Sequence, residues 1–123
     1  MAKIMVVDDA GIVRSMIKKF LTSGGHEIVC EASNGFEAIE KYKEFKPELV
    51  TMDMSMPEMG GIPAVEKIKQ FDPNAKIIMI SAINQKELII KALQAGVINY
   101  IIKPFDEEKL NSTIKETLDK LNK

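Results

Sequence analysis

The segment Lys3-Ile4-Met5-Val6-Val7-Asp8-Asp9 opens the chain with an apolar run that ends abruptly in two aspartates. Three more apolar runs end at a polar residue, and they are residues 49–52 before Asp53, 77–80 before Ser81 and 100–102 before Lys103. Continuous apolar runs that alternate with helix-patterned segments are typical of parallel strands buried on both faces. Because the carboxyl ends of parallel strands share one rim, where ligands bind in open sheets, we expect these polar residues to form one site.

Five segments with helical spacing accompany the apolar runs. Their start and stop signals include Gly24-Gly25 after the first helix, Pro47 after the second and a capping-box spacing of Asn84 and Glu87 before the fourth. We expect helices over residues 10–23, between 35 and 47, from 61, from 84 to 96 and from 106 to 121. The apolar stripes of the first two include Ile12, Phe36, Ile39, Tyr42 and Phe45.

The alternation of strands and helices indicates the fold class. Crossovers between parallel strands are nearly always right-handed, so the helices must cover both faces of one sheet. We predict a single α/β domain over residues 1–123, a doubly wound, flavodoxin-like, five-stranded parallel sheet in the order 2-1-3-4-5 with five helices. In this order the switch point lies between the first and third strands, beside Asp8, Asp9 and Asp53.

Composition excludes several classes of function. The chain has 123 residues, 17 basic and 18 acidic side chains and a net charge of -1, which gives no electrostatic footprint for nucleic acid. The single cysteine, Cys30, allows no internal disulfide, and we expect a buried, inert thiol in a strand. No signal peptide or membrane span is predicted, because Lys91, Gln94 and Asn99 interrupt the long apolar region from 88 to 102. We expect a soluble, cytoplasmic monomer.

Three carboxylates at one rim would repel one another unless a cation were bound. Ligands that are all oxygen indicate a hard cation, and two or three protein carboxylates completed by water suit Mg²⁺ better than Ca²⁺. The simpler alternative is that Asp8 and Asp9 only cap the first helix, which is a common role for aspartate.

Covalent chemistry at this rim would depend on Asp53. The only histidine, His26, follows Gly24-Gly25 in a turn, where we expect a solvated surface imidazole rather than a catalytic base. An ionised carboxylate needs no base and can form an acyl phosphate. A metal ion and the Lys103 ammonium could neutralise the phosphoryl oxygens, while Ser81 donates a hydrogen bond to one of them.

The motifs Val7-Asp8-Asp9, Met52-Asp53-Met54-Ser55-Met56-Pro57, Ile80-Ser81-Ala82 and Lys103-Pro104-Phe105 resemble those of receiver domains of two-component response regulators. The resemblance spans essentially the whole chain. It implies that Asp53 is the phosphoacceptor and that Asp9 and Asp53 bind Mg²⁺ directly. It also implies that Asp8 acts mostly through water and that the Ser55 backbone carbonyl completes the protein ligands.

The resemblance assigns two further roles. Lys103 and Ser81 contact the phosphoryl group, with a cis bond between Lys103 and Pro104. Tyr100 matches an aromatic switch position that turns inward as the serine moves toward the phosphate. Two positions depart from the family. Gly60 stands where many relatives have a polar residue, which would make the loop more mobile. Ile83 stands where some carry an acid or amide, so we expect slow self-dephosphorylation.

With no output domain in sequence, the chain is most similar to stand-alone chemotaxis regulators of the CheY type. Such a protein catalyses only its own phosphorylation and dephosphorylation and is not an enzyme. The implied partners are a CheA-like histidine kinase and a motor-switch or adaptor protein. The latter would bind the fourth helix, fifth strand and fifth helix, where residues 88–90 give excess apolar surface.

Two alternatives remain. A phosphorelay intermediate would pass the phosphoryl group to a histidine phosphotransfer protein, using the same Asp53 chemistry. A magnesium-dependent hydrolase similar to haloacid dehalogenases would need a second aspartate two positions after the nucleophile, and that position is Ser55.

Overall fold

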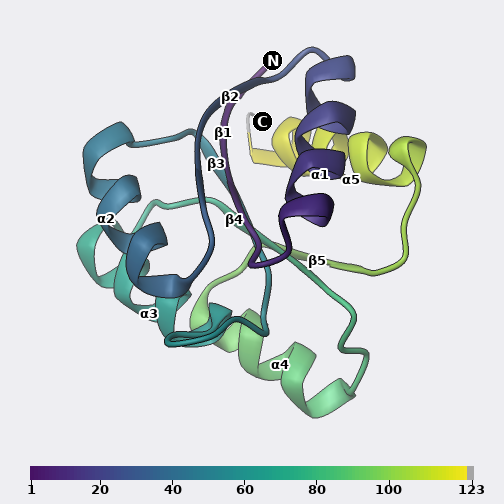
Figure 1. The fold of residues 1–123 in the computed structure, drawn as a ribbon. Coiled ribbons are helices and arrows are strands. Elements are labelled where there is room, and N and C mark those ends of the chain that lie inside the picture. Colours follow the sequence, from purple (N-terminus) through teal and green to yellow (C-terminus); the bar gives the residue numbers. More distant parts are fainter. Residues whose placement is uncertain (122–123) are drawn as a thin grey trace.

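The computed structural model describes residues 1–121 (Figure 1). Five strands alternate with five helices, in the order β1 Lys3–Val7, α1 Gly11–Ser23, β2 Glu27–Ala32, α2 Gly35–Phe45, β3 Leu49–Met52, α3 Gly61–Phe71, β4 Ile77–Ser81, α4 Lys86–Ala95, β5 Asn99–Ile102 and α5 Glu107–Leu121. All strand pairs are parallel, and the sheet order is β2-β1-β3-β4-β5. The predicted doubly wound fold is therefore confirmed.

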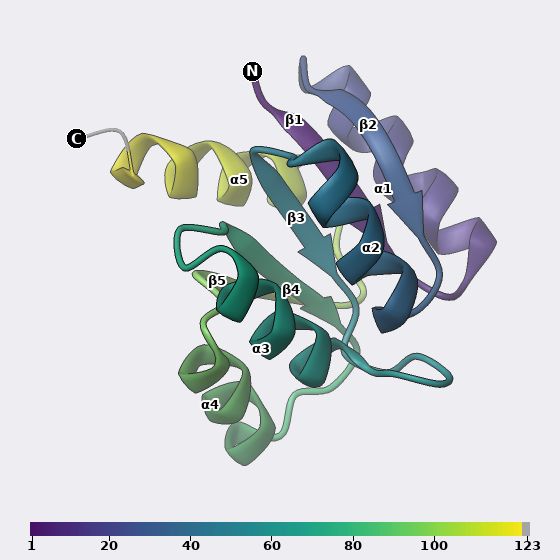
Figure 2. The ribbon, with the colours of Figure 1, turned by 90° about the vertical axis from the view of Figure 1, so that its left-hand side faces the viewer.

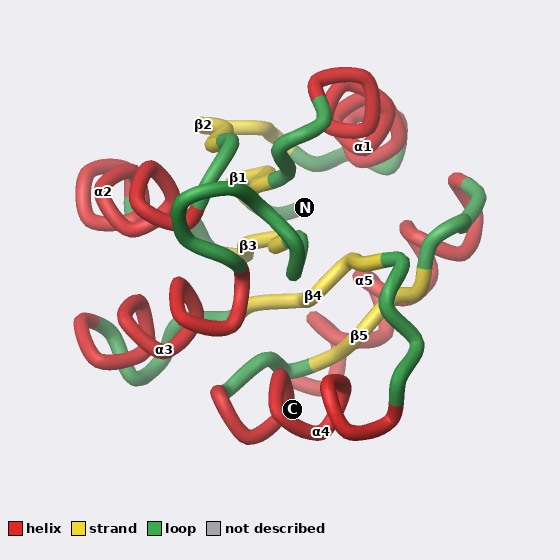
Figure 3. The backbone as a smooth tube through the Cα atoms, turned by 60° about the horizontal axis from the view of Figure 1, so that its bottom comes forward, coloured by secondary structure: helices red, strands yellow, loops and turns green. Residues whose placement is uncertain are grey.

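The sheet lies between two layers of helices, with α1 and α5 on one face and α2, α3 and α4 on the other (Figure 3). An apolar cluster lies beneath each layer. Side chains along β1 alternate between them: Met5 and Val7 pack toward α2, α3 and α4, while Ile4 and Val6 pack toward α1 and α5. Successive residues of a strand point to opposite faces, so a strand covered on both sides is apolar at nearly every position. This is the physical reason for the apolar runs before Asp8, Asp53 and Ser81, in which Thr51 is the one polar residue of β3.

Local sequence explains where α2 begins and ends. The Asn34 side chain accepts a hydrogen bond of 2.9 Å from the backbone N–H of Glu37, and the Glu37 carboxylate accepts one from Ser33 N–H. These reciprocal bonds satisfy donors that lack partners inside the helix. The helix ends at Phe45, and the C-cap residue Lys46, immediately before Pro47, has a left-handed φ of 45°.

The capping box predicted for the fourth helix is wrong. Helix α4 begins at Lys86 after Gln85, and no side chain caps its first N–H groups. Asn84 lies in the loop between β4 and α4. The spacing of Asn84 and Glu87 matches a capping box in sequence, but the N-cap is Gln85, so the helix starts one residue later than that spacing requires.

Three apolar side chains assigned to core stripes lie at the surface instead. Ile12 is 88 % exposed, Phe36 53 % and Phe45 46 %. Tyr42 is buried as expected, and its hydroxyl donates a hydrogen bond of 2.7 Å to Asp72. A helix packed on a sheet buries a narrower stripe than its apolar residues suggest, so periodicity overestimates the buried set.

Cys30 lies in β2 as predicted, but its side chain is only partly buried because β2 is an edge strand. Burial still raises the pKa of the thiol, which keeps it protonated and unreactive. Within residues 1–121, no helix combines the length and the hydrophobicity needed to cross a bilayer.

Candidate functional site

The carboxyl ends of β1, β3, β4 and β5 meet at one rim. Backbone hydrogen bonds continue past the strand ends and fix them, since Asp53 N–H donates to the Val7 carbonyl at 3.0 Å and Lys103 N–H to the Ser81 carbonyl at 2.9 Å. The structure places Asp8 directly after β1, Asp53 after β3 and Lys103 after β5. Asp8 and Lys103, which are 95 positions apart in sequence, are thereby held within hydrogen-bond distance of each other.

Three carboxylates gather at this rim. Asp8, Asp9 and Asp53 each present an oxygen within 4.8 Å of the other two. Asp8 is 1 % exposed and Asp53 6 %, whereas Asp9 is exposed to solvent. Asp8 also accepts a hydrogen bond from Ala10 N–H at 2.9 Å. Because Ala10 is itself the N-cap of α1 and no side chain caps the first N–H groups of this helix, the alternative in which Asp8 and Asp9 only cap the first helix is wrong.

Lys103 is the cation of the cluster. Its ammonium lies 2.8 Å from Asp8 Oδ2 and 3.6 Å from Asp53 Oδ1. The peptide bond between Lys103 and Pro104 is cis, as the resemblance implied. One ammonium among three carboxylates leaves the cluster with excess negative charge.

The surroundings of Asp53 raise the pKa of its carboxyl group. Burial, together with the neighbouring Asp8 and Asp9 carboxylates, raises the pKa of Asp53 to about 6, and Lys103 only partly opposes the shift. A bound divalent cation would relieve this repulsion. The donor set is all oxygen, with one carboxylate open to water, and it fits Mg²⁺, which keeps several water ligands.

Ser81 and Tyr100 form the other side of the rim. Ser81 is buried at the end of β4, and its Oγ accepts a hydrogen bond of 3.1 Å from Ile83 N–H, which leaves its hydroxyl proton free to donate. Tyr100, in β5, donates from its hydroxyl to the Ile83 carbonyl at 2.7 Å. Burial raises the pKa of Tyr100, so the phenol remains a donor. Both residues therefore bond to the same short loop after β4.

The loop that carries Ser55 is held against the rim by two glycines. Gly61 N–H donates to the Met54 carbonyl at 2.8 Å, and a Cβ atom at Gly61 would collide with the Asp53 carbonyl oxygen. Gly35 N–H donates to the Met59 carbonyl at 2.8 Å. Ser55 itself is exposed in this loop. The sequence predicts a helix start at Gly61, but it does not reveal that the backbone of Gly61 lies close to the Asp53 carbonyl.

Sequence reasoning also missed Arg14. Its guanidinium donates to the Asp8 carbonyl at 2.7 Å and to the Glu31 carboxylate at 2.8 Å, so it ties the Asp8 turn to β2. Lys18 binds the same Glu31 carboxylate. An arginine one helical turn after an acidic pair is a weak signal, because such residues usually lie on a solvated helix face.

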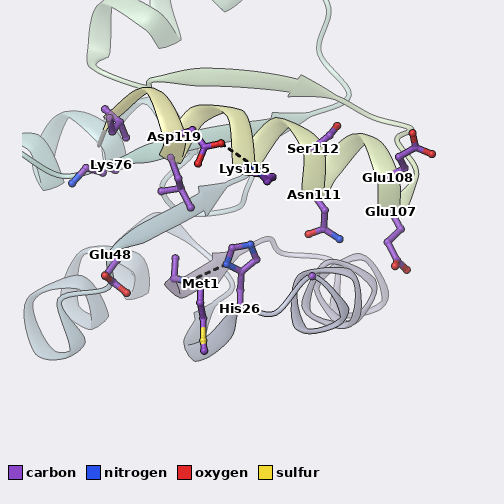
Figure 4. A pocket seen from close by; sticks show the side chains of 14 residues that line it. Met1, His26, Glu48, Lys76, Glu107, Glu108, Asn111, Ser112, Lys115 and Asp119 are labelled. Atoms are coloured by element: carbon purple, nitrogen blue, oxygen red, sulfur yellow. Dashed lines mark hydrogen bonds and ion pairs between the residues drawn. The ribbon is translucent and has the colours of Figure 1, made fainter. Parts of the chain in front are cut away.

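A hollow lies at the opposite end of the sheet (Figure 4). It has a volume of about 840 Å³ and lies between α5 and the residues that precede the strands, among them Ala2, His26, Glu48 and Lys76. Its charges are of both signs, and Lys115 and Asp119 neutralise each other at 3.1 Å. Size alone does not make it a reaction site.

His26 corrects one expectation at this hollow. It is half-buried rather than fully solvated, and its Nδ1 accepts a hydrogen bond of 3.0 Å from Ala2 N–H (Figure 4). Burial and the nearby amino terminus lower the pKa of His26, so the ring is neutral. The imidazole is remote from the acidic rim, as the sequence indicated.

Comparison with known proteins agrees with this geometry. Residues 4–115 match the response regulator receiver domain family. The chain is 48 % identical to the chemotaxis protein CheY of Thermotoga maritima over 98 % of both chains, and 50 % identical to CheY of Bacillus subtilis over 95 % of this chain and 98 % of that one. Among solved structures, the CheX-CheY-BeF3-Mg complex of Borrelia burgdorferi superposes with a TM-score of 0.92 at 34 % identity, covering 94 % of this chain and 88 % of that one. With an acidic cluster at the switch point and a family match over nearly its full length, the chain belongs to the response regulator receiver domain family.

Proposed function

We propose that the protein is a CheY-type chemotaxis response regulator that accepts a phosphoryl group on Asp53. The observation that carries this assignment is the convergence of Asp8, Asp9 and Asp53 with the Lys103 ammonium 3.6 Å from the Asp53 oxygen. As a receiver domain it is a signalling module rather than an enzyme that turns over an external substrate.

In the proposed reaction an Asp53 oxygen attacks the phosphorus of a phosphohistidine on the kinase. The P–N bond breaks, the imidazole leaves as a neutral ring after it takes up a proton, and an acyl phosphate forms on Asp53. Mg²⁺ bound by Asp9, Asp53 and the Ser55 carbonyl, with Asp8 acting through water, would stabilise charge on the phosphoryl oxygens. Lys103, whose ammonium lies 3.6 Å from Asp53, and the Ser81 hydroxyl would bind the remaining oxygens.

The activated state would be transmitted through Ser81 and Tyr100. Both bond to Ile83 in the loop that leads to α4. A phosphoryl group that attracts the Ser81 hydroxyl would favour one arrangement of this loop over another, which is a population shift of a pre-existing equilibrium.

The proposed output surface consists of α4, β5 and α5. Ile90 and Leu93 of α4 and Ile102 of β5 are each more than 40 % exposed. Exposed apolar residues on adjacent elements support a partner site, where a motor-switch or adaptor protein would bind. Of the predicted residues 88–90, only Ile90 contributes strongly, because Leu88 and Ile89 are partly buried. The kinase would be CheA-like, and the protein would act in the cytoplasm as a monomer.

The test is phosphorylation by acetyl phosphate with Mg²⁺, followed by mass spectrometry and peptide mapping. We expect the mass of one phosphoryl group on Asp53 in the wild-type protein and none in Asp53→Asn. Modification at another residue, or equal modification without Mg²⁺, would overturn the assignment. Transfer back to a purified histidine phosphotransfer domain would favour the phosphorelay role instead, and repeated turnover of a small phosphoester would favour the hydrolase.

A further inference from the structure

A second surface feature lies between α2 and α3, which run side by side on one face of the sheet (Figure 2). A hollow of about 410 Å³ separates them. Its lining includes Phe36, Ile39 and Lys43 from α2, Lys67 and Phe71 from α3, and Met59 from the loop before α3. We call this surface the α2–α3 groove. It shares no element with the output surface proposed on α4, β5 and α5.

The floor and walls of the α2–α3 groove are apolar. Phe36 is 53 % exposed and Phe71 47 %, while Ile39 and Met59 are partly buried beneath them. Phe36, Ile39 and Lys43 have the spacing i, i+3 and i+7, so they form one stripe along α2. Contiguous apolar surface framed by polar residues marks an interaction site more often than scattered single side chains do.

The charges that line the groove are all positive. Lys43 and Lys67 each lack a carboxylate within ion-pair distance among residues 1–121. The Lys43 ammonium lies 5.4 Å from the centre of the Phe71 ring, which keeps the charge at the edge of the apolar surface. None of the carboxylates of α2 and α3, which are Glu37, Glu40, Glu44 and Glu66, lines the hollow.

These observations define the chemistry of an occupant. A groove between two helices accepts the apolar face of a third helix, and positive charges along it favour carboxylates on that helix. We propose that the α2–α3 groove binds an amphipathic helix of a partner protein, with apolar side chains on one face and aspartates or glutamates along its flanks. The proposal does not depend on phosphorylation of Asp53.

Two helical peptides with the same leucine face but opposite flanks, one with glutamates and one with lysines, test the proposal. Each is titrated into ¹⁵N-labelled protein, and the amide shifts of Phe36, Ile39, Lys43 and Phe71 are followed. We expect the glutamate peptide to shift these amides and to bind at least tenfold more tightly than the lysine peptide. The same titration with Asp53→Asn should give the same result, which separates this site from the chemistry at the rim.

Charge reversal supplies the matched comparison. Lys43→Glu/Lys67→Glu should weaken binding of the glutamate peptide at least tenfold and favour the lysine peptide, whereas Lys86→Glu/Lys91→Glu on α4 should change neither. Thermal melts verify folding, and Lys43→Gln/Lys67→Gln replaces the reversal if that variant unfolds. The proposal is overturned if neither peptide shifts the groove amides, or if the shifts map to α4, β5 and α5. It is also overturned if the protein dimerises at high concentration without peptide and the groove amides shift as it does so, since the occupant would then be a second copy of this chain.

Discussion

The two ends of the sheet differ in a way that volume does not capture. At the amino ends, a hollow of about 840 Å³ is lined by charges of both signs that pair locally or point to solvent. At the carboxyl ends, three carboxylates lie within 4.8 Å of one another, and the Lys103 ammonium lies 2.8 Å from Asp8 and 3.6 Å from Asp53. In this fold, therefore, convergence of side chains at the strand ends, rather than the size of a cavity, identifies the reactive site.

The largest expected effect comes from replacing a pair of acidic residues at each end of the sheet and comparing the Mg²⁺ affinities. Asp8→Asn/Asp9→Asn should lower Mg²⁺ affinity by more than roughly a hundredfold. Mutation of residues that only support the metal ligands already lowers metal affinity by about 10- to 100-fold. Glu107→Gln/Glu108→Gln removes the same charge at the amino-end hollow and should leave the affinity unchanged. Calorimetric titration with Mg²⁺ measures both, and equal losses in the two variants would contradict the account.

The glycine that lets α3 approach Asp53 gives the next largest effect. Gly61→Ala should reduce the free energy of unfolding by about 2–3 kcal/mol, because the new methyl group would collide with the Asp53 carbonyl oxygen. Gly11→Ala is the matched control at the first residue of α1, where a Cβ meets only the end of the Arg14 side chain at 4.0 Å. Urea unfolding of both variants tests this, and similar stabilities would show that the contact at Gly61 is unimportant.

The electrostatic cost of the acidic rim should appear as a pH dependence of stability. Since the pKa of Asp53 is raised to about 6, its protonated form stabilises the fold at low pH, and that contribution is lost as the pH rises through 6. Without Mg²⁺, Asp53→Asn should therefore be about 1–3 kcal/mol more stable than the wild type at pH 7.5.

The same pair of proteins should be nearly equal in stability at pH 4, and Mg²⁺ should reduce the difference at pH 7.5. Urea unfolding in EDTA and in Mg²⁺ provides the measurement. A wild-type protein that is the more stable of the two at pH 7.5 without metal would show that Lys103 already neutralises the cluster.

The smallest expected effect concerns the lifetime of the phosphorylated state. Ile83 is partly buried beside Ser81, and it offers no group that could orient an attacking water. Ile83→Glu should shorten the half-life of the phosphoprotein about tenfold, short of the roughly hundredfold that a well-positioned general base gives. Ile83→Val is the control and should keep the slow rate. The hypothesis of slow self-dephosphorylation fails if radiolabelled phosphate is lost at the same rate from both variants.

Much of the fold could be predicted because burial on two faces leaves a plain signal. The runs before Asp8, Asp53 and Ser81 are apolar except at Lys3 and Thr51, and right-handed crossovers require helices on both faces of the sheet. Helix surfaces were predicted less well. Ile12 and Phe36 match an apolar stripe yet are exposed, because which part of a stripe is buried depends on the tilt of the helix against the sheet.

The convergence at the rim could likewise be predicted for Asp8, Asp9, Asp53 and Lys103, since each follows a strand directly. Arg14 and Gly61 could not. Arg14 contacts Asp8 because α1 folds back beside the turn that follows β1. The contact of Gly61 with the Asp53 carbonyl depends on the path of the loop between β3 and α3. Neither contact produces a periodic pattern or a residue spacing that can be recognised in the sequence.

One site at the carboxyl ends of the strands is expected to bind both the metal and the phosphoryl group. A crystal structure of the protein with Mg²⁺ and beryllofluoride would test this. We expect beryllium bonded to an Asp53 oxygen, Mg²⁺ between Asp9 and Asp53, and fluorine contacts from Ser81 and Lys103. Beryllofluoride bound elsewhere, or Mg²⁺ bound without Asp53, would contradict it.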